Sequence, residues 1–366
     1  MRIYLILTYI LLPFFLDASF ARKHESARNS CEHKSTESIK RPCSSEPEGR
    51  GFRILFYNVE NLFDTFNDPE KNDNAFTPDG DMRWTPYRLN KKISNIYKAI
   101  TAAGEWNMPA IIGLCEVENS DVLEMLVNNT GLKNGGFQIV HRNSPDTRGI
   151  DVAALYRPDD FLLLEKWFAG ITFPFDTATT TRDILYMKGI AGGDDTLHLF
   201  VNHWPSRWGG QAATAPYRNH AATVLKSITD SLVLINPSAK IIIMGDFNDD
   251  PGDESLKKYL EAGFDYNKPV SGRLYNVSKE ISNSRSGSYK YQGVWYLYDQ
   301  FIVSGSMING TGRLQTSPQS VKVYNEAFLL IPDATWFGLK PFRSYEGFRY
   351  KGGFSDHLPV YLDVWW

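Results

Sequence analysis

The sequence predicts an α+β protein in which two β-sheets stack face to face and helices cover both outer faces, a four-layer α/β/β/α sandwich. Predicted strands outnumber predicted helices, and the two do not alternate strictly, which argues against a single doubly wound sheet. Two apolar runs, Ala110–Val117 and Lys240–Met244, are continuous rather than alternating. Such runs are typical of strands that are covered on both faces.

Length and composition are those of a globular protein with a large core. The chain has 366 residues, of which 42% are hydrophobic and 14% aromatic, and its formal net charge is −3. Without a basic excess, a nucleic-acid-binding protein needs a local cationic patch or metal ions at the phosphate. Composition therefore neither requires nor excludes a nucleic-acid substrate. It implies no stable protein partner, and we expect a monomer.

The amino-terminal residues have the layout of a secretory signal peptide. Arg2 precedes an apolar run over residues 3–16, and Ser19 and Ala21 are small residues at the −3 and −1 positions of a cleavage site. An uncleaved membrane anchor is the alternative, but the run is shorter than the ~20 residues that a spanning helix needs. We therefore expect residues 1–21 to be removed near Ala21 and the protein to be exported, to the periplasm or beyond the cell.

Residues 22–50 are predicted to form a disordered polar leader, because they contain almost no large apolar side chains. Cys31 and Cys43 lie in this leader, where they form either a disulfide, as export permits, or two free thiols. Cys115 lies in an apolar run and is expected in the core. No spacing of Cys and His resembles a zinc site. The ordered domain is expected to span residues 51–366.

Hydrophobic periodicity places the elements of this domain. A strand is predicted at Phe52–Val59, and a long polar loop over residues 64–84 follows it. Thr85 and Pro86 are typical of a helix start, and this helix should extend to Ala103. Further strands are predicted at Ala110–Val117, Asp151–Tyr156, Leu197–Asn202, Lys240–Gly245, Tyr296–Ser304 and Leu358–Trp365. Further helices are predicted at Ser120–Asn128, around a face with Ala221, Val224, Leu225 and Ile228, and from Asp253 to Gly263.

Acidic, amide and histidine side chains gather where apolar strands end. Any one of these clusters is typical of a turn or a surface ion pair. Together they are more informative, because carboxylates that share a cleft repel each other unless a cation or a proton joins them. Hard oxygen ligands favour Mg²⁺, Mn²⁺ or Ca²⁺ over zinc. The clusters are Asn58–Asn61, Glu116–Asn119, Arg148–Asp151, Asn202–Pro205, Gly245–Asn248, Tyr298–Gln300 and Ser355–His357.

This ordered series resembles the endonuclease/exonuclease/phosphatase superfamily, which includes deoxyribonuclease I, abasic-site endonucleases, neutral sphingomyelinases and inositol polyphosphate 5-phosphatases. The matching stretches run from Phe52 to Val360, and the most specific are GDFN and SDH at the ends of apolar strands. The resemblance implies a deoxyribonuclease I-like α/β/β/α sandwich. It also implies an enzyme that hydrolyses phosphate esters with the help of a divalent cation, Mg²⁺ above all.

The resemblance implies a metal site as well. Glu116 resembles the family's principal metal-binding carboxylate, and Asn58 and Glu60 lie beside it in the expected site. Glu60 is the less certain of these ligands, because the family often has another polar group there. Asp356 is expected at the metal or its water shell.

Five further residues are similar to the family's catalytic groups. Asp246 resembles the acid that orients or deprotonates the attacking water, and Asn248 the amide that holds a phosphate oxygen. His357 resembles the histidine of the SDH motif, with Asp299 as the carboxylate that orients it. His203 resembles a second histidine that contacts phosphate. Histidine suits these roles because it titrates near neutral pH.

Supporting residues are assigned with open alternatives. Asp151 is expected to orient His203, and the alternative is that it caps a turn or pairs with Arg148. Arg148 and Arg207 are either phosphate ligands or solvated loop residues. Trp208, like Trp204, is expected to pack or to anchor a loop, with base stacking as the alternative. The remaining histidines are expected to be structural or solvated, namely His141, His198 and His220.

The substrate is left open by these residues. A nuclease or related phosphodiesterase acting on nucleic acid is the first hypothesis, and export favours nutrient scavenging or extracellular DNA. The second is a phospholipid or inositol-phosphate phosphoesterase. The third is a non-catalytic binding module, against which the full set of mutually repelling carboxylates argues. A cationic groove would favour nucleic acid, and an exposed apolar loop would favour lipid.

Overall fold

The computed structural model describes residues 50–366 except residue 106, residues 283–286 and residue 311. The first strand, β1 (Gly51–Leu62), begins where the sequence predicts the ordered domain to begin. The signal peptide, the leader up to residue 49 and the two cysteines within it lie outside the described residues.

Two six-stranded sheets form the centre of the domain. The pairs β1–β2 and β7–β8 are parallel, and the other neighbours within both sheets are antiparallel. The first sheet contains, in spatial order, β13 (Val321–Val323), β18 (Val360–Trp365), β1, β2 (Ile111–Val117), β4 (Asp151–Tyr156) and β3 (Gln138–His141). The second contains β5 (Phe161–Ala169), β6 (Ile184–Ala191), β7 (Asp195–His203), β8 (Lys240–Asp246), β12 (Asp299–Ser304) and β9 (Leu274–Asn276).

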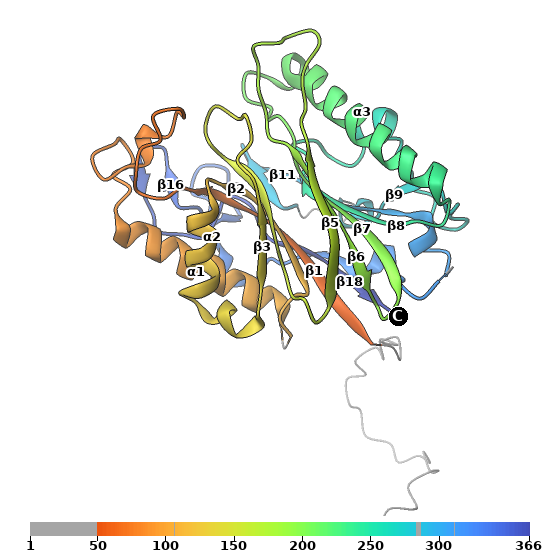
Figure 1. The fold of residues 1–366 in the computed structure, drawn as a ribbon. Coiled ribbons are helices and arrows are strands. Elements are labelled where there is room, and N and C mark those ends of the chain that lie inside the picture. The colour runs from red at the N-terminus through yellow and green to blue at the C-terminus, as the bar shows by residue number, and fades with distance from the viewer. Residues whose placement is uncertain (1–49, 106, 283–286, 311) are drawn as a thin grey trace, which may run out of the picture. The chain divides into compact units, whose positions relative to one another are not determined.

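Helices cover the outer faces of both sheets, with α1 and α2 on one side and α3 on the other (Figure 1). Within the described part of the chain, none of them combines the length and apolar character that a transmembrane span requires. The α-helices are α1 (Pro86–Gly104), α2 (Ser120–Asn128), α3 (Gln211–Ile235) and α4 (Lys279–Ser282). Short 3₁₀ turns lie at Asn74–Phe76, Gly131–Gly135, Gly305–Met307, Pro318–Ser320 and Ala327–Leu329, and one π-helical turn at Ser255–Tyr259.

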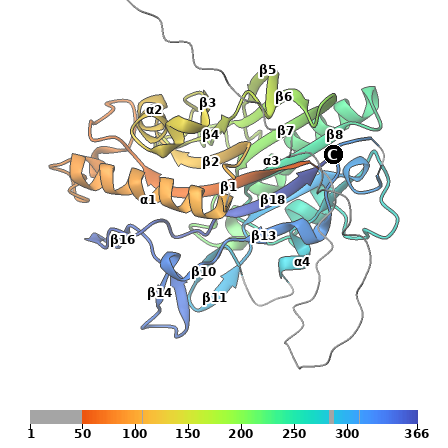
Figure 2. The same cartoon turned by 90° about the horizontal axis from the view of Figure 1, so that it is seen from below.

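Three small hairpins complete the domain. Figure 2 shows β10, β11 and β14 together on the side of the molecule away from β5 and β6. The hairpins are β10 (Tyr289–Tyr291) with β11 (Val294–Tyr296), β14 (Leu330–Pro332) with β15 (Leu339–Pro341), and β16 (Tyr345–Glu346) with β17 (Arg349–Tyr350).

Strand alternation divides the core into three layers. In β1, Ile54 and Phe56 pack between the two sheets, whereas Leu55 and Tyr57 pack under α1 and α2. A third cluster lies between the second sheet and α3. Side chains of a strand alternate between its faces, so a sheet that buries both faces needs apolar residues at every position. The four-layer α/β/β/α sandwich predicted from the continuous apolar runs is thus confirmed.

The predicted helix from Thr85 to Ala103 is confirmed, with Pro86 in its first turn. Two other predictions need correction. The helix from Asp253 to Gly263 is wrong, since only a π-helical turn forms there and the Asp253 carboxylate instead accepts from the Asp250 amide. The strand predicted at Tyr296–Ser304 is two strands, because the chain leaves β11 at Tyr296 and enters β12 at Asp299.

Candidate active site

The expected site residues lie at one open end of the core between the sheets. In β1, Asn58 follows Phe56 by two positions and so points to the same side, toward the second sheet. In β8, Asp246 follows Met244 in the same way. The Asn58 amide Nδ2 donates to Asp246 Oδ2 at 3.0 Å, which joins the two sheets at this end.

Strand direction brings two more side chains to the same edge. The parallel strands β7 and β8 both end there, and the antiparallel strand β12 begins there. As a result, His203 at the end of β7 and Asp299 at the start of β12 are both register partners of Asp246. The edge thus collects residues that are far apart in the sequence.

Irregular backbone completes the site. Pairing of β1 with β2 shifts register beyond Asn58, and pairing of β2 with β4 shifts around Glu116. Glu60 and Glu116 have φ values of 50° and 63°, and Asn248 has a φ of 51°, all in the left-handed region that L-residues rarely occupy. Bulges and such strained residues turn side chains away from strict alternation and gather at functional sites.

Asp246 is the central carboxylate of the cluster. Besides Asn58 it accepts a hydrogen bond from the Asn248 amide at 2.9 Å. The Nε2 atoms of His203 and His357 lie 3.7 Å and 3.8 Å from Asp246 Oδ2. Burial, opposed by His357 and reinforced by Asp299, raises the pKa of Asp246 to about 7. This carboxyl group is therefore able to take up a proton near neutral pH.

Glu116 lies beside this acid and lines the cleft. Its Oε1 accepts from Asn58 Nδ2 at 3.3 Å, and its Oε2 accepts from the Asn61 amide at 2.9 Å. Asn58 thus donates to both carboxylates, while its own oxygen accepts from the Glu60 amide at 2.9 Å. In this arrangement Asn58 positions the two acids, and its role as a metal ligand stays a prediction.

The predicted pair of Asp299 and His357 is confirmed. His357 Nδ1 lies 2.7 Å from Asp299 Oδ2, and the aspartate is fully buried. Burial by itself would lower the pKa of His357, but the carboxylates of Asp299 and Asp246 outweigh it and raise this pKa well above its ordinary value. His357 is therefore held as a cation with its Nε2 toward Asp246.

The predicted pair of Asp151 and His203 is wrong. Asp151 instead lies 3.2 Å from His141 Nε2 and accepts the Ser144 amide at 2.8 Å. The reason is strand alternation in β4, where Asp151 shares a face with Ala153, which packs toward the helices and not toward the second sheet. Asp151 therefore closes the loop between β3 and β4, and it pairs with His141, which was expected to be structural or solvated.

His203 is buried without a carboxylate at hydrogen-bond distance. Burial, followed by the positive charges of Arg182 and Arg148, lowers its pKa well below the ordinary value, so His203 is neutral. Among the described residues its Nδ1 has no hydrogen-bond partner. Buried Arg182 donates to the backbone oxygens of His203 and Trp204 at 3.2 Å and 2.6 Å and pairs with Asp146, so it fixes the chain at the end of β7.

Glu60 does not face Glu116 and Asp246. Its Oε1 accepts from Arg343 Nε at 3.0 Å, its Oε2 accepts the Ser344 amide at 2.7 Å, and Lys92 Nζ lies 3.7 Å away. A carboxylate that two cations and an amide already engage is poorly placed to bind a metal ion, so the metal role expected for Glu60 is not supported.

Asp356 lines the cleft and pairs with Arg343 at 3.0 Å. Burial would raise the pKa of Asp356, but Arg343 and then His357 outweigh it and lower the value, so this carboxylate stays ionised. Arg343 thus bridges Glu60 and Asp356. No sequence signal marks this arginine, because its partner Glu60 is 283 residues away.

The two arginines of the sequence analysis differ in their surroundings. Arg207 donates to the Asn248 carbonyl at 2.7 Å and pairs with Asp249 and Asp253, so its charge is balanced within the protein. Arg148 is half exposed, lies 3.6 Å from Asp146 and lines the cleft. Arg148 is thus the better placed of the two to meet a phosphate.

The two tryptophans also differ. Trp204 is fully buried and packs edge-on against Phe247, as expected. Trp208 is 90% exposed, so the expectation that it packs is wrong.

These residues surround a cleft of about 810 Å³. Its floor carries the acids and histidines, and one wall is built from tyrosines. Besides Trp208, the lining includes Glu116, Arg148, His203, Arg207, Asp246, Asn248, Tyr289, Tyr291, Tyr296, Tyr298, Arg343, Asp356 and His357.

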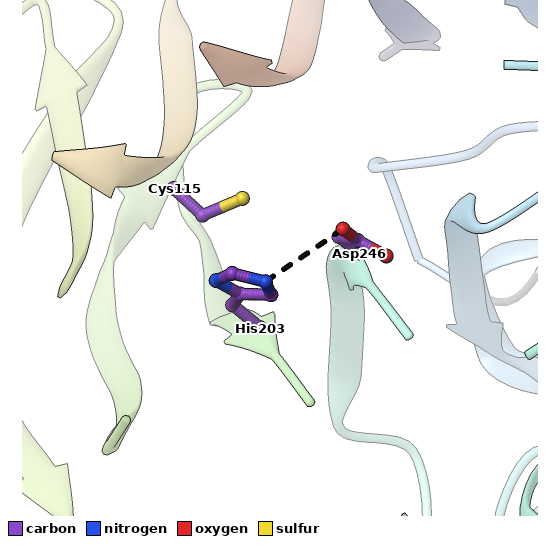
Figure 3. A group of neighbouring side chains, drawn as sticks. All are labelled: Cys115, His203 and Asp246. Carbon is purple, nitrogen blue, oxygen red and sulfur yellow. Dashed lines mark ion pairs between the residues drawn. The ribbon is translucent and has the colours of Figure 1, made fainter. Parts of the chain in front are cut away.

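Two sets of buried side chains within the described residues lie close enough to share one metal ion. One is Asp246 with Asp299 and His357. The other, Cys115 with His203 and Asp246, comes from three different strands (Figure 3). Burial, reinforced by Asp246, raises the pKa of the Cys115 thiol well above its ordinary value, so its sulfur remains protonated and is a poor ligand.

The donor set fits a hard divalent cation. Glu116, Asp246 and Asp356 offer carboxylate oxygens around one cleft. Buried Asp299 Oδ1 has no hydrogen-bond partner among the described residues. Asn58 Nδ2 donates to both Glu116 and Asp246, so these two carboxylates are neighbours, and a cation such as Mg²⁺ would offset their repulsion.

Several solved structures have a similar fold. Humanized D. rerio TDP2 has a TM-score of 0.51 at 14% identity, covering 86% of this chain and 98% of its own. The human Nocturnin catalytic domain with bound sulfate has a TM-score of 0.52 at 16% identity, covering 86% and 94%. An endonuclease/exonuclease/phosphatase family protein from Bacteroides thetaiotaomicron has a TM-score of 0.50 at 13% identity, covering 87% and 95%. At such identities the likeness shows the fold alone.

The sandwich of paired sheets, with acids and histidines at one end of its inner core, defines a hydrolase fold of the deoxyribonuclease I type. The family model described as Endonuclease/Exonuclease/phosphatase family matches residues 53–365. The chain belongs to this family. No curated protein matches it.

Proposed function

We propose that this protein is a divalent-metal-dependent phosphodiesterase that hydrolyses nucleic acid. The observation that carries the proposal is the arrangement around Asp246. This acid, whose pKa is raised to about 7 chiefly by burial, lies 3.8 Å from a cationic His357 that Asp299 holds in place. A proton acceptor and a hydrogen-bond-donating cation thus share one cleft, as hydrolysis of a phosphodiester requires.

The residues divide the reaction between them. Asp246 orients a water molecule for in-line attack on phosphorus and accepts its proton. As the new P–O bond forms, the bond to the leaving oxygen breaks, and this oxygen takes up a proton from water. The His357 imidazolium and the side-chain amide of Asn248 donate hydrogen bonds to the charged phosphoryl oxygens. Glu116 would hold a divalent cation, which would neutralise charge on the phosphate and lower the pKa of a water molecule bound to it.

The metal requirement is tested by removing the cation and its principal ligand separately. Glu116→Gln should lower kcat by about a thousandfold or more and leave the circular dichroism spectrum and Tm near those of the wild type. EDTA should abolish hydrolysis, and added Mg²⁺ or Mn²⁺ should restore it. Full activity in EDTA would refute the metal mechanism, and an inactive wild type with every metal would favour a non-catalytic binding module.

The substrate class is tested with a panel that contains plasmid DNA, RNA, sphingomyelin vesicles, bis-p-nitrophenyl phosphate and p-nitrophenyl phosphate. Hydrolysis of nucleic acid and of the diester, with the monoester cleaved much more slowly, is the expected result. Hydrolysis of p-nitrophenyl phosphate alone would make the protein a monoesterase and contradict the proposal.

A phospholipid phosphoesterase is the second candidate, and one surface feature favours it. The tip of the β14–β15 hairpin exposes Trp336, Phe337 and Leu339. Exposed apolar patches of this kind mark contacts with membranes or other proteins. Cleavage of sphingomyelin vesicles without cleavage of nucleic acid would establish this candidate in place of the first.

A further inference from the structure

We propose that the cleft binds unpaired nucleobases on aromatic side chains beside the scissile phosphate, so that single-stranded nucleic acid is the preferred substrate. This inference rests on the proposed nuclease function and specifies its substrate class. Four tyrosines and one tryptophan line the cleft together with the catalytic residues. Aromatic rings are the side chains that hold single strands, because every base has a face on which to stack.

Three of the tyrosines form a continuous ladder that leads to the catalytic histidine. The rings of Tyr296 and Tyr298 stack with centroids 5.1 Å apart, and those of Tyr298 and Tyr289 with centroids 5.3 Å apart. The Tyr289 ring lies 4.8 Å from the His357 ring, which it meets at 32°. The aromatic wall and the site of phosphate chemistry are therefore one surface.

Arg207 holds the ladder in place at Tyr298. The Arg207 guanidinium lies 4.9 Å from the centroid of the Tyr298 ring, and Asp249 and Asp253 fix this arginine in turn. Tyr298 is only 6% exposed. Its role is therefore to support the wall, and the rings available to a ligand are others.

Two aromatic rings at the rim are free to receive bases. Trp208 follows β7 in the loop before α3 and is 90% exposed. Tyr291, at the end of β10, is 54% exposed. Both line the same cleft as His203 and His357. An exposed aromatic ring gains no free energy from burial, and a base stacked on it would remove its surface from water and supply that free energy.

Few unpaired cations line the cleft, so it lacks the row of phosphate contacts on which duplex binding depends. Duplex binders depend on many lysine and arginine contacts to phosphate. Here Arg207 and Arg343 each pair with two carboxylates, and the formal net charge of the chain is −3. In a duplex the base faces are stacked on each other and are unavailable to side chains, whereas an unpaired strand presents them.

The test compares one oligonucleotide as a single strand, as a duplex and as a strand of the same length with abasic residues. The wild type should cleave the single strand with a kcat/KM about tenfold or more above that of the duplex. Trp208→Ala and Tyr291→Ala should each raise KM for the single strand roughly 5- to 100-fold, as expected for one lost stacking contact, with a smaller effect on kcat. Trp208→Phe and Tyr291→Phe should restore most of the affinity.

Two controls separate stacking from general damage. Tyr87→Ala removes a ring that is 76% exposed but is not part of the cleft, and it should leave KM unchanged. On the abasic strand the Trp208→Ala variant should match the wild type, because there is no base to lose.

Failure of this inference is distinguishable from failure of the proposed function. Equal cleavage of duplex and single strand, or an unchanged KM in both alanine variants, would overturn the inference and leave a nuclease. No cleavage of any nucleic acid, with hydrolysis of bis-p-nitrophenyl phosphate or of sphingomyelin vesicles, would overturn both. If Trp208→Ala raised KM only for sphingomyelin vesicles and not for the oligonucleotides, Trp208 would contact lipid and the inference would be wrong.

Discussion

His203 and His357 flank Asp246 at similar distances, but their pKa values shift in opposite directions. His357 has the Asp299 carboxylate behind it, whereas His203 is buried near the positive charge of Arg182. Burial disfavours the charged form of both rings, so the neighbouring charges decide the outcome. One histidine is thus a cation and the other is neutral, and the two act differently on a phosphate.

Replacing Asp299 tests this assignment. Asp299→Asn should lower kcat by about 10²- to 10⁴-fold, because the imidazolium loses the charge that stabilises it. Since Asp299 raises the pKa of His357, the variant should lose activity at lower pH than the wild type as the pH increases. The alkaline limb of the pH–rate profile, and the ring titration of His357 by NMR, would show this shift.

Asp159→Asn, at an exposed position outside the cleft, is the matched control and should behave like the wild type. An alkaline limb that does not move in Asp299→Asn would contradict the assignment of the cationic state to His357.

Asp151 should prove structural. Asp151→Asn weakens a buried pair with His141 and a bond from the Ser144 amide, so it should lower the free energy of unfolding by about 1–3 kcal/mol. The pH–rate profile should keep its shape, because Asp151 does not contact His203. Urea denaturation and steady-state kinetics measure the two effects, and a shifted profile at unchanged stability would restore the predicted pair with His203.

At the scale of elements, strand alternation decides which polar residues meet. Asn58 and Asp246 continue the inward-facing rows of β1 and β8, so the predicted strands already place them on facing sides of the sandwich. By the same alternation, the Asp151 side chain in β4 points away from the second sheet and toward the helices. Glu116 departs from the rule, because the register shift and the φ of 63° redirect it. Alternation is readable from sequence, whereas bulges are not.

One strand pair should make stability depend on pH. His198 Nδ1 in β7 lies 2.7 Å from the Tyr186 hydroxyl in β6, and burial, with Lys188 second, lowers the pKa of His198 from 6.5 to about 4. Because the folded protein disfavours the protonated ring, the neutral His198 contributes its full stability above pH 6.5. This contribution is lost as the pH falls from about 6.5 toward 4, where the unfolded chain takes up a proton more readily than the folded one. The loss should be roughly 1–2 kcal/mol, reduced by partial access of solvent.

Urea denaturation between pH 7 and pH 4 measures this effect. His198→Gln, which cannot take up a proton, should lose less stability over that interval than the wild type. Tyr186→Phe should be less stable at pH 7 but keep the pH dependence of the histidine. Parallel curves for the wild type and His198→Gln would show that other groups dominate.

At the scale of the whole molecule, the sandwich brings residues at the ends of β2, β7 and β8, together with His357 from the segment before β18, to one cleft. Its catalytic floor is the polar end of the core, while its rim comes from loops and the β10–β11 hairpin. One fold can carry different substrate specificities, so we expect the rim of the cleft to decide the substrate. This is why the tyrosine wall and Trp208 carry more information about substrate than the acids do.

Export remains a proposal about residues 1–21. The protein expressed with its own amino terminus should be recovered from the periplasm or the medium, and mass spectrometry should find a mature chain that begins near Arg22. Replacing Leu7 and Ile10 by Arg interrupts the apolar run and should retain the chain in the cytoplasm. A full-length chain in the membrane fraction would instead indicate an uncleaved anchor.

The sequence by itself determined the sandwich, the paired apolar strands and the polar residues at their ends. These features follow from local periodicity, and the pair of Asp299 with His357 followed from the resemblance of the SDH motif to a known family. Only the tertiary structure decided which partners the other charged groups have. Arg343 engages Glu60 across 283 residues, and Asp151 turns to His141 on a strand that periodicity did not reveal. Such pairs form between segments that are far apart in the sequence, and local sequence patterns do not show which of these segments come into contact.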